Sequence, residues 1–131
     1  MKTIQFDSGV KAYKLGAGVL RFHPGDPNVY ARFLEGAEKL RQIQQQLRES
    51  TDTLSALQTA DRQMKQVLGW IFGPGNDFEE MLAGVNLLAV GSSGKLLVTS
   101  LFEALEPVLT EGAEHCAAAA AAQAKVARDS R

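Results

Sequence analysis

The sequence has few of the residues that make covalent cross-links or metal sites. Its 131 residues include one cysteine, Cys116, and two histidines. A lone cysteine cannot form an internal disulfide, and residues 1–7 lack the apolar run of a secretory leader. We therefore expect a protein of a reducing cytosol.

Long hydrophobic runs and an excess of charge are also missing. No window approaches the roughly 18 consecutive apolar residues that a membrane helix needs. Fourteen Lys and Arg against fifteen Asp and Glu leave a net charge of −1, so no overall basic field attracts phosphates. We expect neither a membrane protein nor a nucleic-acid-binding protein.

Candidate catalytic residues are scarce. His23 precedes a turn proline, and the adjacent His115 and Cys116 would point about 100° apart on a helix, which does not suit zinc. The acidic residues of segment 73–114 are expected as solvated charges that could attract a basic partner. We assign no catalytic, metal-binding or cofactor-binding residue and expect no enzyme activity, cofactor or small-molecule substrate.

The glycine-rich run 91–95 keeps one chemical alternative open. A turn of this kind before a helix can bind a phosphate. However, Ala89 replaces the first glycine of the phosphate-loop pattern and Leu96 replaces its final hydroxyl residue. The run is therefore a flexible helix cap or, as the alternative, the site of a small anion- or nucleotide-binding protein.

The N-terminal residues 1–23 predict a small hairpin or three short strands. Apolar residues alternate there in the manner of strands, and Asp7–Gly9 and Gly16–Gly18 can supply the turns. Two or three short strands are marginal in water by themselves. This sheet must therefore pack on helices or join another sheet.

Apolar residues at helical spacing predict two long helices after residue 26. Asp26 is the expected N-cap and Pro27 the first helical residue of a helix that ends near Ser50. Residues 50–53 can cap a second helix, which stops at residues 73–75. The short connection between the two helices predicts an antiparallel pair.

The C-terminal half is less regular. Asn76 and Asp77 are expected to cap a short helix that ends at Gly84. Residues 85–90 are apolar enough for a buried strand or helix, between which periodicity does not decide. A last helix follows the glycine-rich run, and Pro107 is expected to kink or break it.

These patterns together predict an α+β fold, mainly α, with a small N-terminal antiparallel hairpin packed on three or four helices. One domain is expected over residues 1–114, made of a hairpin region, 1–23, and a helical region, 26–114. The alanine-rich residues 115–131 are expected to form a loosely ordered helical tail, because alanine favours helix but buries little area.

Apolar side chains gather around the break at residues 73–75. Aromatic residues and methionine beside such a hinge are typical of helix-groove recognition, and also of the core of a small bundle. We select five candidates for partner contact or for the core that supports it: Trp70, Phe72, Phe78, Met81 and Leu87.

Two segments resemble a known family. The run Val67–Gly75 places an aromatic and glycine stretch after a helix, and the run Gly84–Leu88 precedes the last helix. This layout resembles the tail assembly chaperones of siphophages and prophages, in which a Phe-Gly-x-Gly segment and a downstream Asn-Leu recur. The resemblance covers residues 1 to about 110.

The resemblance implies an assembly role without catalysis. Such proteins coat the long, aggregation-prone tape measure protein in the host cytoplasm, recruit tail tube subunits and are absent from the mature virion. We expect those two partners here, and a homo-oligomer is possible. The alternative is a structural tail or connector subunit that stays in the particle and self-associates through its N-terminal strands.

Overall fold

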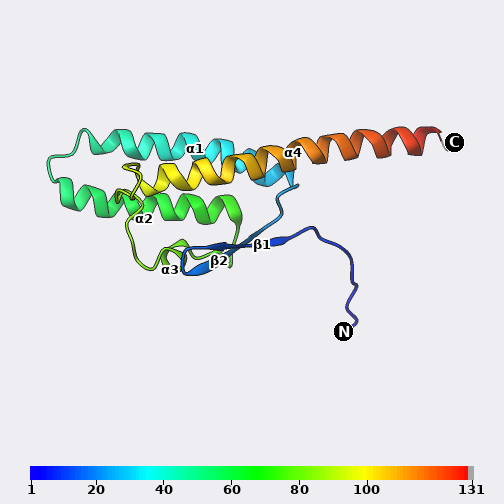
Figure 1. The fold of residues 1–131 in the computed structure, drawn as a ribbon, viewed down its shortest axis with the longest axis horizontal. Helices are drawn as coiled ribbons and strands as arrows, with labels where there is room; N and C mark the ends of the chain where they lie inside the picture. Colours follow the sequence, from blue (N-terminus) through cyan, green and yellow to red (C-terminus); the bar gives the residue numbers. More distant parts are fainter. Residues whose placement is uncertain (130–131) are drawn as a thin grey trace.

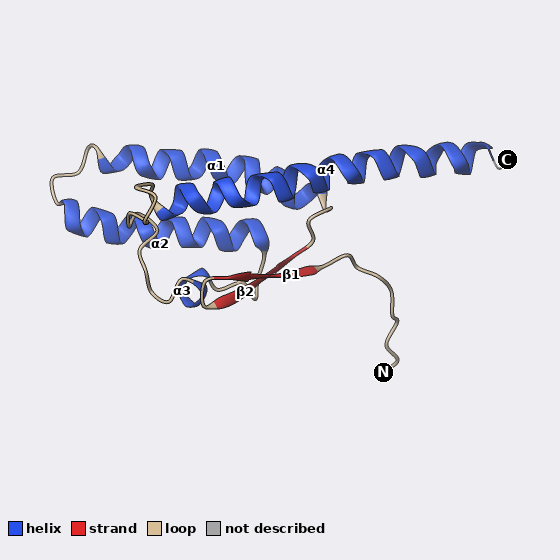
Figure 2. Ribbon diagram, viewed as in Figure 1, coloured by secondary structure: helices blue, strands red, loops and turns tan. Residues whose placement is uncertain are grey.

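The structure, a computed structural model, describes the backbone of residues 1–129 and the side chains of residues 1–124. A hairpin of strands β1 (Lys11–Leu15) and β2 (Gly18–Phe22) precedes the helices (Figures 1 and 2). The helices over the described residues are α1 (Pro27–Leu47), α2 (Thr53–Phe72), α3 (Phe78–Met81) and α4 (Leu97–Asp129). The predicted α+β, mainly α fold class is confirmed.

The two strands pair in antiparallel register, with Tyr13 opposite Leu20. Gly16 begins the turn with a φ of 57°, which glycine adopts without steric penalty. Of the two predicted arrangements, the structure contains the hairpin. Residues 1–10 form no strand, and Ile4 and Phe6 remain exposed.

Helices α1 and α2 form the predicted antiparallel pair (Figure 1). Asp26 and Asp52 are their N-caps, and Pro27 is the first residue of α1. The two helices approach closely at Gly36, where a Cβ atom would collide with the side chain of Ile71.

One hydrophobic core joins the hairpin to the helices. The ring of Phe22 in β2 lies 4.9 Å from that of Phe72 in α2 and 5.1 Å from that of Tyr13, centroid to centroid. The buried apolar residues are Leu20, Phe22, Val29, Phe33, Leu40, Met64, Leu68, Ile71, Phe72, Phe78, Met81, Leu87, Val98, Leu101, Leu105 and Leu109. The sheet is therefore packed on helices, as its small size requires.

Residues 85–90 form neither the strand nor the helix predicted for them. They run as turns that end in an isolated bridge between Val90 and Leu96. Leu87 is fully buried, but Val85 and Val90 are 44% and 67% exposed. The prediction is wrong because polar groups of α2, described below, bind the backbone of this segment in place of a ladder or a helical turn.

Helix α4 is continuous through Pro107, where a kink or break was expected. The proline removes the N–H that would bind the carbonyl of Glu103, and both residues are exposed, so this carbonyl lies on the solvent side. With 33 residues, α4 is about 50 Å long, and its C-terminal part projects past the other elements (Figure 1). The predicted boundary at residue 114 falls inside this helix. The side chains of residues 125–131, in the expected tail, lie outside the described part.

Gly112 sets how closely α4 approaches the turn between β2 and α1. A Cβ atom at this position would overlap the carbonyl oxygen of Pro24 and crowd the nitrogen of Gly25. Backbone atoms cannot rotate away as the end of a side chain can. The contact between α4 and this turn therefore requires glycine.

We expect Gly112→Ala to lower the free energy of unfolding by about 1–3 kcal/mol, because the methyl group must push α4 away from Pro24. Gly69, inside α2, is the matched control, since a Cβ atom there meets nothing within 4 Å. Gly69→Ala should raise stability by about 0.5–1 kcal/mol through helix propensity alone. Urea unfolding measures both changes, and equal stabilisation by the two alanines would contradict the close contact.

Candidate functional site

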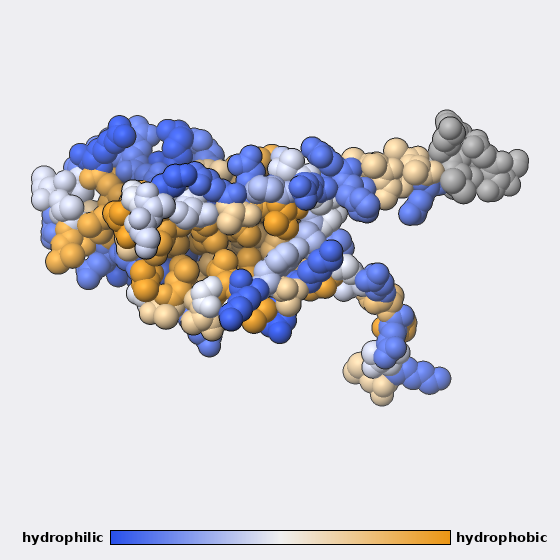
Figure 3. Space-filling model, viewed as in Figure 1, coloured by the Kyte–Doolittle hydropathy of each residue, from blue (hydrophilic) through white to orange (hydrophobic). Residues whose placement is uncertain are grey.

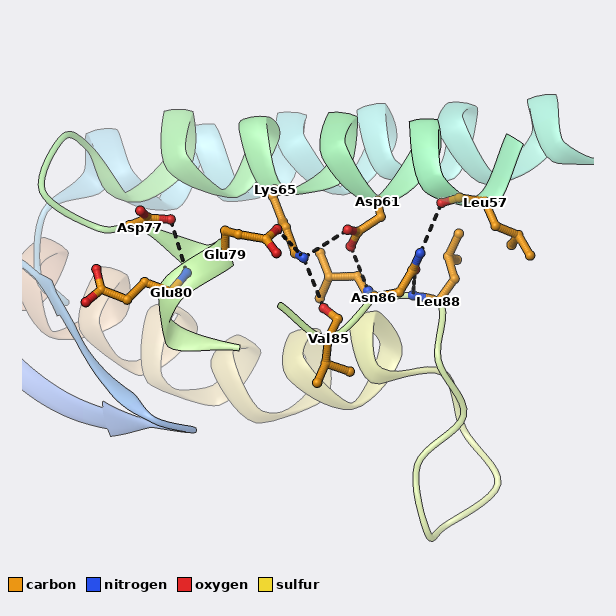
Figure 4. A network of polar contacts seen from close by, with 10 residues as sticks. Leu57, Asp61, Lys65, Asp77, Glu79, Glu80, Val85, Asn86 and Leu88 are labelled. Atoms are coloured by element: carbon orange, nitrogen blue, oxygen red, sulfur yellow. Dashed lines mark hydrogen bonds and ion pairs between the residues drawn. The ribbon is translucent and has the colours of Figure 1, made fainter. Parts of the chain in front are cut away.

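A row of α2 residues faces the segment that follows α3 (Figure 4). Leu57, Asp61 and Lys65 are spaced by four residues and so lie on one side of the helix. Lys65 Nζ donates to Asp61 Oδ2 at 2.9 Å, to Glu79 Oε2 at 2.6 Å and to the carbonyl oxygen of Val85 at 3.0 Å. These acceptors match the three donors of an ammonium group.

The same row binds the backbone beyond Val85. Asp61 Oδ1 accepts the N–H of Leu87 at 2.8 Å. Asn86 donates to the carbonyl oxygen of Leu57 at 3.2 Å and accepts the N–H of Leu88 at 2.8 Å. Side chains therefore satisfy the polar backbone groups that surround the fully buried Leu87.

The ammonium group of Lys65 pairs with two carboxylates, the buried one of Asp61 and the more exposed one of Glu79. The side chains of Lys65 and Asp61 are 7% and 12% exposed, whereas that of Glu79 is 58% exposed. Burial alone would lower the pKa of Lys65, but its hydrogen bonds to Glu79 and Asp61 and their negative charges outweigh that effect and raise it. The folded protein thus favours the charged ammonium.

Asn76 and Asp77 were both expected to cap the short helix, but Asn76 does not take part in the cap. Asp77 alone is the N-cap, accepting the N–H of Glu80 at 3.2 Å. Asn76 instead accepts the N–H of Arg21 at 2.9 Å and donates to the Arg21 carbonyl oxygen at 2.8 Å. It also donates to the carbonyl oxygen of Phe72, at 3.1 Å. One amide therefore joins the outer edge of β2 to the end of α2.

The start of α4 is not free to bind a phosphate. The N–H groups of Leu97 and Val98 each donate to a backbone carbonyl of the preceding segment at 2.9 Å. In the glycine-rich turn, Lys95 Nζ binds Glu103 Oε2 at 2.9 Å. Because these donors are already used, the geometry favours the helix-cap interpretation of residues 91–95.

Among the described residues, no group of three or more His, Cys, Asp or Glu side chains lies close enough together to hold a metal ion. His23 Nδ1 accepts the N–H of Gly25 at 3.1 Å, which is a turn contact. His115 is exposed on α4, beside the half-buried Cys116. Within the described residues, no helix has the length and apolar character to cross a membrane.

Four of the five candidate residues lie in the core. Phe72, Phe78, Met81 and Leu87 are each no more than 6% exposed, so the structure places them as supporting core. Trp70 differs, because it is 39% exposed. Of the five candidates, only Trp70 presents an accessible contact surface.

Trp70 lines a groove of about 390 Å³ between α1 and α2. The other lining residues are Lys39, Gln42, Ile43, Gln46, Gln63, Gln66 and Val67. Lys39 Nζ lies 3.8 Å from the centroid of the Trp70 ring, a cation–π contact that covers one face of the indole. We call this surface the Trp70 groove.

The Trp70 groove combines apolar contact area with neutral polar groups. Ile43, Val67 and Trp70 supply the apolar part, and each glutamine amide offers both donors and an acceptor without adding charge. Hydrophobic surface also gathers over the middle of the bundle on the face shown in Figure 3, where α1 forms a hydrophilic border. The groove is suited to an amphipathic segment whose polar residues vary.

The chain matches no protein-family model, and no curated protein or solved structure is significantly similar to it. Its fold class therefore rests on the arrangement of its own elements. Its function has to be argued from its surfaces.

Sequence reasoning missed the residues of the polar network. Asp61 and Lys65 lie four apart beside the apolar stripe of α2, where an opposite pair usually stabilises an exposed helix surface. A polar residue, Asn86, inside the apolar run 85–90 was the other available signal. Neither signal identifies the partner across the fold.

We expect Lys65→Met to lower the free energy of unfolding by about 3–5 kcal/mol, because Asp61 would stay buried without its cation. Lys95→Met is the matched control. Lys95 and Glu103 are 53% and 55% exposed, so that loss should be about 0–1 kcal/mol. Chemical denaturation at neutral pH compares the two, and similar losses would argue against the buried network as a structural anchor.

The same variant tests the pH dependence. Since the folded-state pKa of Lys65 is raised, its ion pairs contribute fully below the unfolded-state pKa of about 10.4 and lose that contribution as the pH rises through the folded-state value. The stability difference between wild type and Lys65→Met should therefore be constant from neutral to mildly alkaline pH and shrink at higher pH. A difference that stays constant through strongly alkaline pH would contradict this assignment.

Proposed function

We propose that the protein is a phage tail assembly chaperone that acts by binding and not by catalysis. In this role it binds the tape measure protein in the host cytoplasm, keeps it soluble, recruits tail tube subunits and leaves before the virion is complete. The proposal combines the resemblance of the runs Val67–Gly75 and Gly84–Leu88 with the surface of the folded chain.

The Trp70 groove is the observation that carries this proposal. A chaperone that coats a long helical protein meets many different turns of helix, so its contact surface must accept varied polar residues. Four glutamines border the groove, and among the described side chains Lys39 is the only charged residue that lines it. Neutral amides can rearrange their hydrogen bonds without leaving a buried charge unpaired.

Trp70 is the natural anchor of such a contact. Tryptophan is enriched among residues that dominate binding energy, because it buries a large area and loses little conformational freedom. Lys39 already packs on one face of the indole and helps to fix its orientation. The exposed remainder of the ring is available to a partner.

A structural tail or connector subunit is the second candidate. A specific observation favours it, since β1 lies at the edge of a two-stranded sheet and could pair with another subunit. Mass spectrometry of purified particles separates the two roles. A chaperone should be missing from them, whereas a structural subunit should be present in stoichiometric amounts.

The proposal is tested by co-expressing the tagged protein with the long helical protein encoded nearest downstream, followed by affinity capture and light scattering. We expect a soluble complex with several copies of this chain per partner. Trp70→Gln should weaken capture by about tenfold or more, as for a central anchor residue. Leu34→Gln is the control, because Leu34 is 56% exposed on α1 but does not line the groove.

One result would count against the chaperone role, and another against the Trp70 groove as the contact surface. If the chain elutes without the partner while the partner remains insoluble, the chaperone role is wrong. If a complex forms and Trp70→Gln, folded by circular dichroism, is captured like wild type, the role stands but another surface performs it.

A further inference from the structure

The outer edge of β1 has unused hydrogen-bonding groups. In the hairpin register, Leu15 pairs with Gly18 across the turn, and Tyr13 pairs with Leu20. Alternate residues of an antiparallel strand point their backbone groups away from the neighbour, so those of Ala12 and Lys14 face outward. Within the described residues, neither forms a backbone hydrogen bond on that side.

The opposite edge of the sheet is occupied at Arg21. The outward N–H and carbonyl oxygen of Arg21 in β2 are both bonded to the Asn76 amide, at 2.9 and 2.8 Å. The backbone N–H of Ala17, in the turn, donates to the carbonyl oxygen of Met81 at 2.9 Å. An added strand would therefore find more free hydrogen-bonding groups on β1, where those of both Ala12 and Lys14 face outward, than on β2.

The N-terminal arm, residues 1–10, has the pattern of a strand but no partner. Ile4 and Phe6 are two residues apart, as on one face of a strand, and are 85% and 79% exposed. The arm stands away from the body of the molecule (Figures 1 and 3). At its base, the side chains of Asp7 and Ser8 accept backbone N–H groups two residues on. The arm thus leads away from the β1 edge of its own chain.

The edge and the arm are complementary in length and in side-chain pattern. Strand β1 has five residues, and residues 3–7 of the arm can cover them. Tyr13 and Leu15 point to the core side of β1 but remain half-buried at the edge of the sheet. A strand with Ile4 and Phe6 on that same side would cover the exposed parts of these two residues.

We propose that residues 3–7 of one copy of this chain add as a third strand to the free edge of β1 in a second copy. Each copy then gives one strand and receives one, which closes as a dimer or a ring if the rotation between copies closes and otherwise continues as a filament. Backbone hydrogen bonds supply the pairing, and burial of Ile4 and Phe6 fixes the side that faces the core. The inference does not depend on the proposed function, since a chaperone or a particle subunit could use the same contact.

The test is the mass of the purified full chain and its variants, measured by size-exclusion chromatography with light scattering. We expect wild type to have a multiple of the 14.1 kDa chain mass. Deletion of residues 2–8 and the double variant Ile4→Ser/Phe6→Ser should each give a single chain. The conservative double variant Ile4→Val/Phe6→Leu should keep the mass of wild type.

A further variant tests the edge itself. Lys14→Pro removes an outward N–H, at a position where an edge strand tolerates proline, and should also give a single chain. Its fold is checked by circular dichroism. Because this variant could lose the hairpin, a second measurement uses the deletion variant, to which a synthetic peptide of residues 1–8 is added. We expect that peptide to shift the amide NMR signals of Ala12 and Lys14.

Wild type that remains a single chain at every concentration tested would overturn the inference. A deletion variant with the mass of wild type would overturn it as well. So would a deletion variant whose Ala12 and Lys14 amide signals do not shift when the peptide is added. None of these measurements involves the tape measure protein. Failure here is therefore distinguishable from failure of the proposed function.

Discussion

The position of α4 depends on three groups along one side of α2: the backbone carbonyl of Leu57 and the side chains of Asp61 and Lys65. We call these three residues the α2 row. The chain between α3 and α4 has no helix or ladder of its own, yet it must enter the core so that Leu87 can be buried. Unpaired backbone groups in such a place are costly. The α2 row binds them, and no buried side-chain nitrogen or oxygen atom in the described residues lacks a partner. Once fixed, the segment binds the first N–H groups of α4 and sets where that helix starts.

The hairpin depends on the helices in turn. Two strands of five residues bury too little to be stable alone. Contacts with α3 and with the ring of Phe72 in α2 supply the missing burial, and the Asn76 amide binds the outward backbone groups of Arg21 in β2. The position of the N-terminal arm is therefore a consequence of how α2 ends.

Much of the fold could be predicted from local signals. The caps Asp26 and Asp52, the long apolar stripes and the breaks at glycine all act over a few residues, so they are readable in sequence. Segment 85–90 could not be assigned, because its partners lie on α2, where Asp61 is 26 positions from Leu87. The role of Asn76 was hidden for the same reason, since Arg21 is 55 residues away. Likewise, the sequence pattern selected Trp70 together with four residues that are buried in the core. The exposure of Trp70 is visible only in the packed structure.

The amide of Asn76 makes the two edges of the small sheet unequal, because it binds the backbone of β2 and not that of β1. A sheet with two open edges is a template that can extend without limit, which is how cross-β aggregates grow. Here one side chain takes both outward backbone groups of Arg21, so strand addition beside β2 is hindered at that residue. The fold therefore directs an incoming strand to one side of the hairpin, beside β1, and disfavours strand addition beside β2.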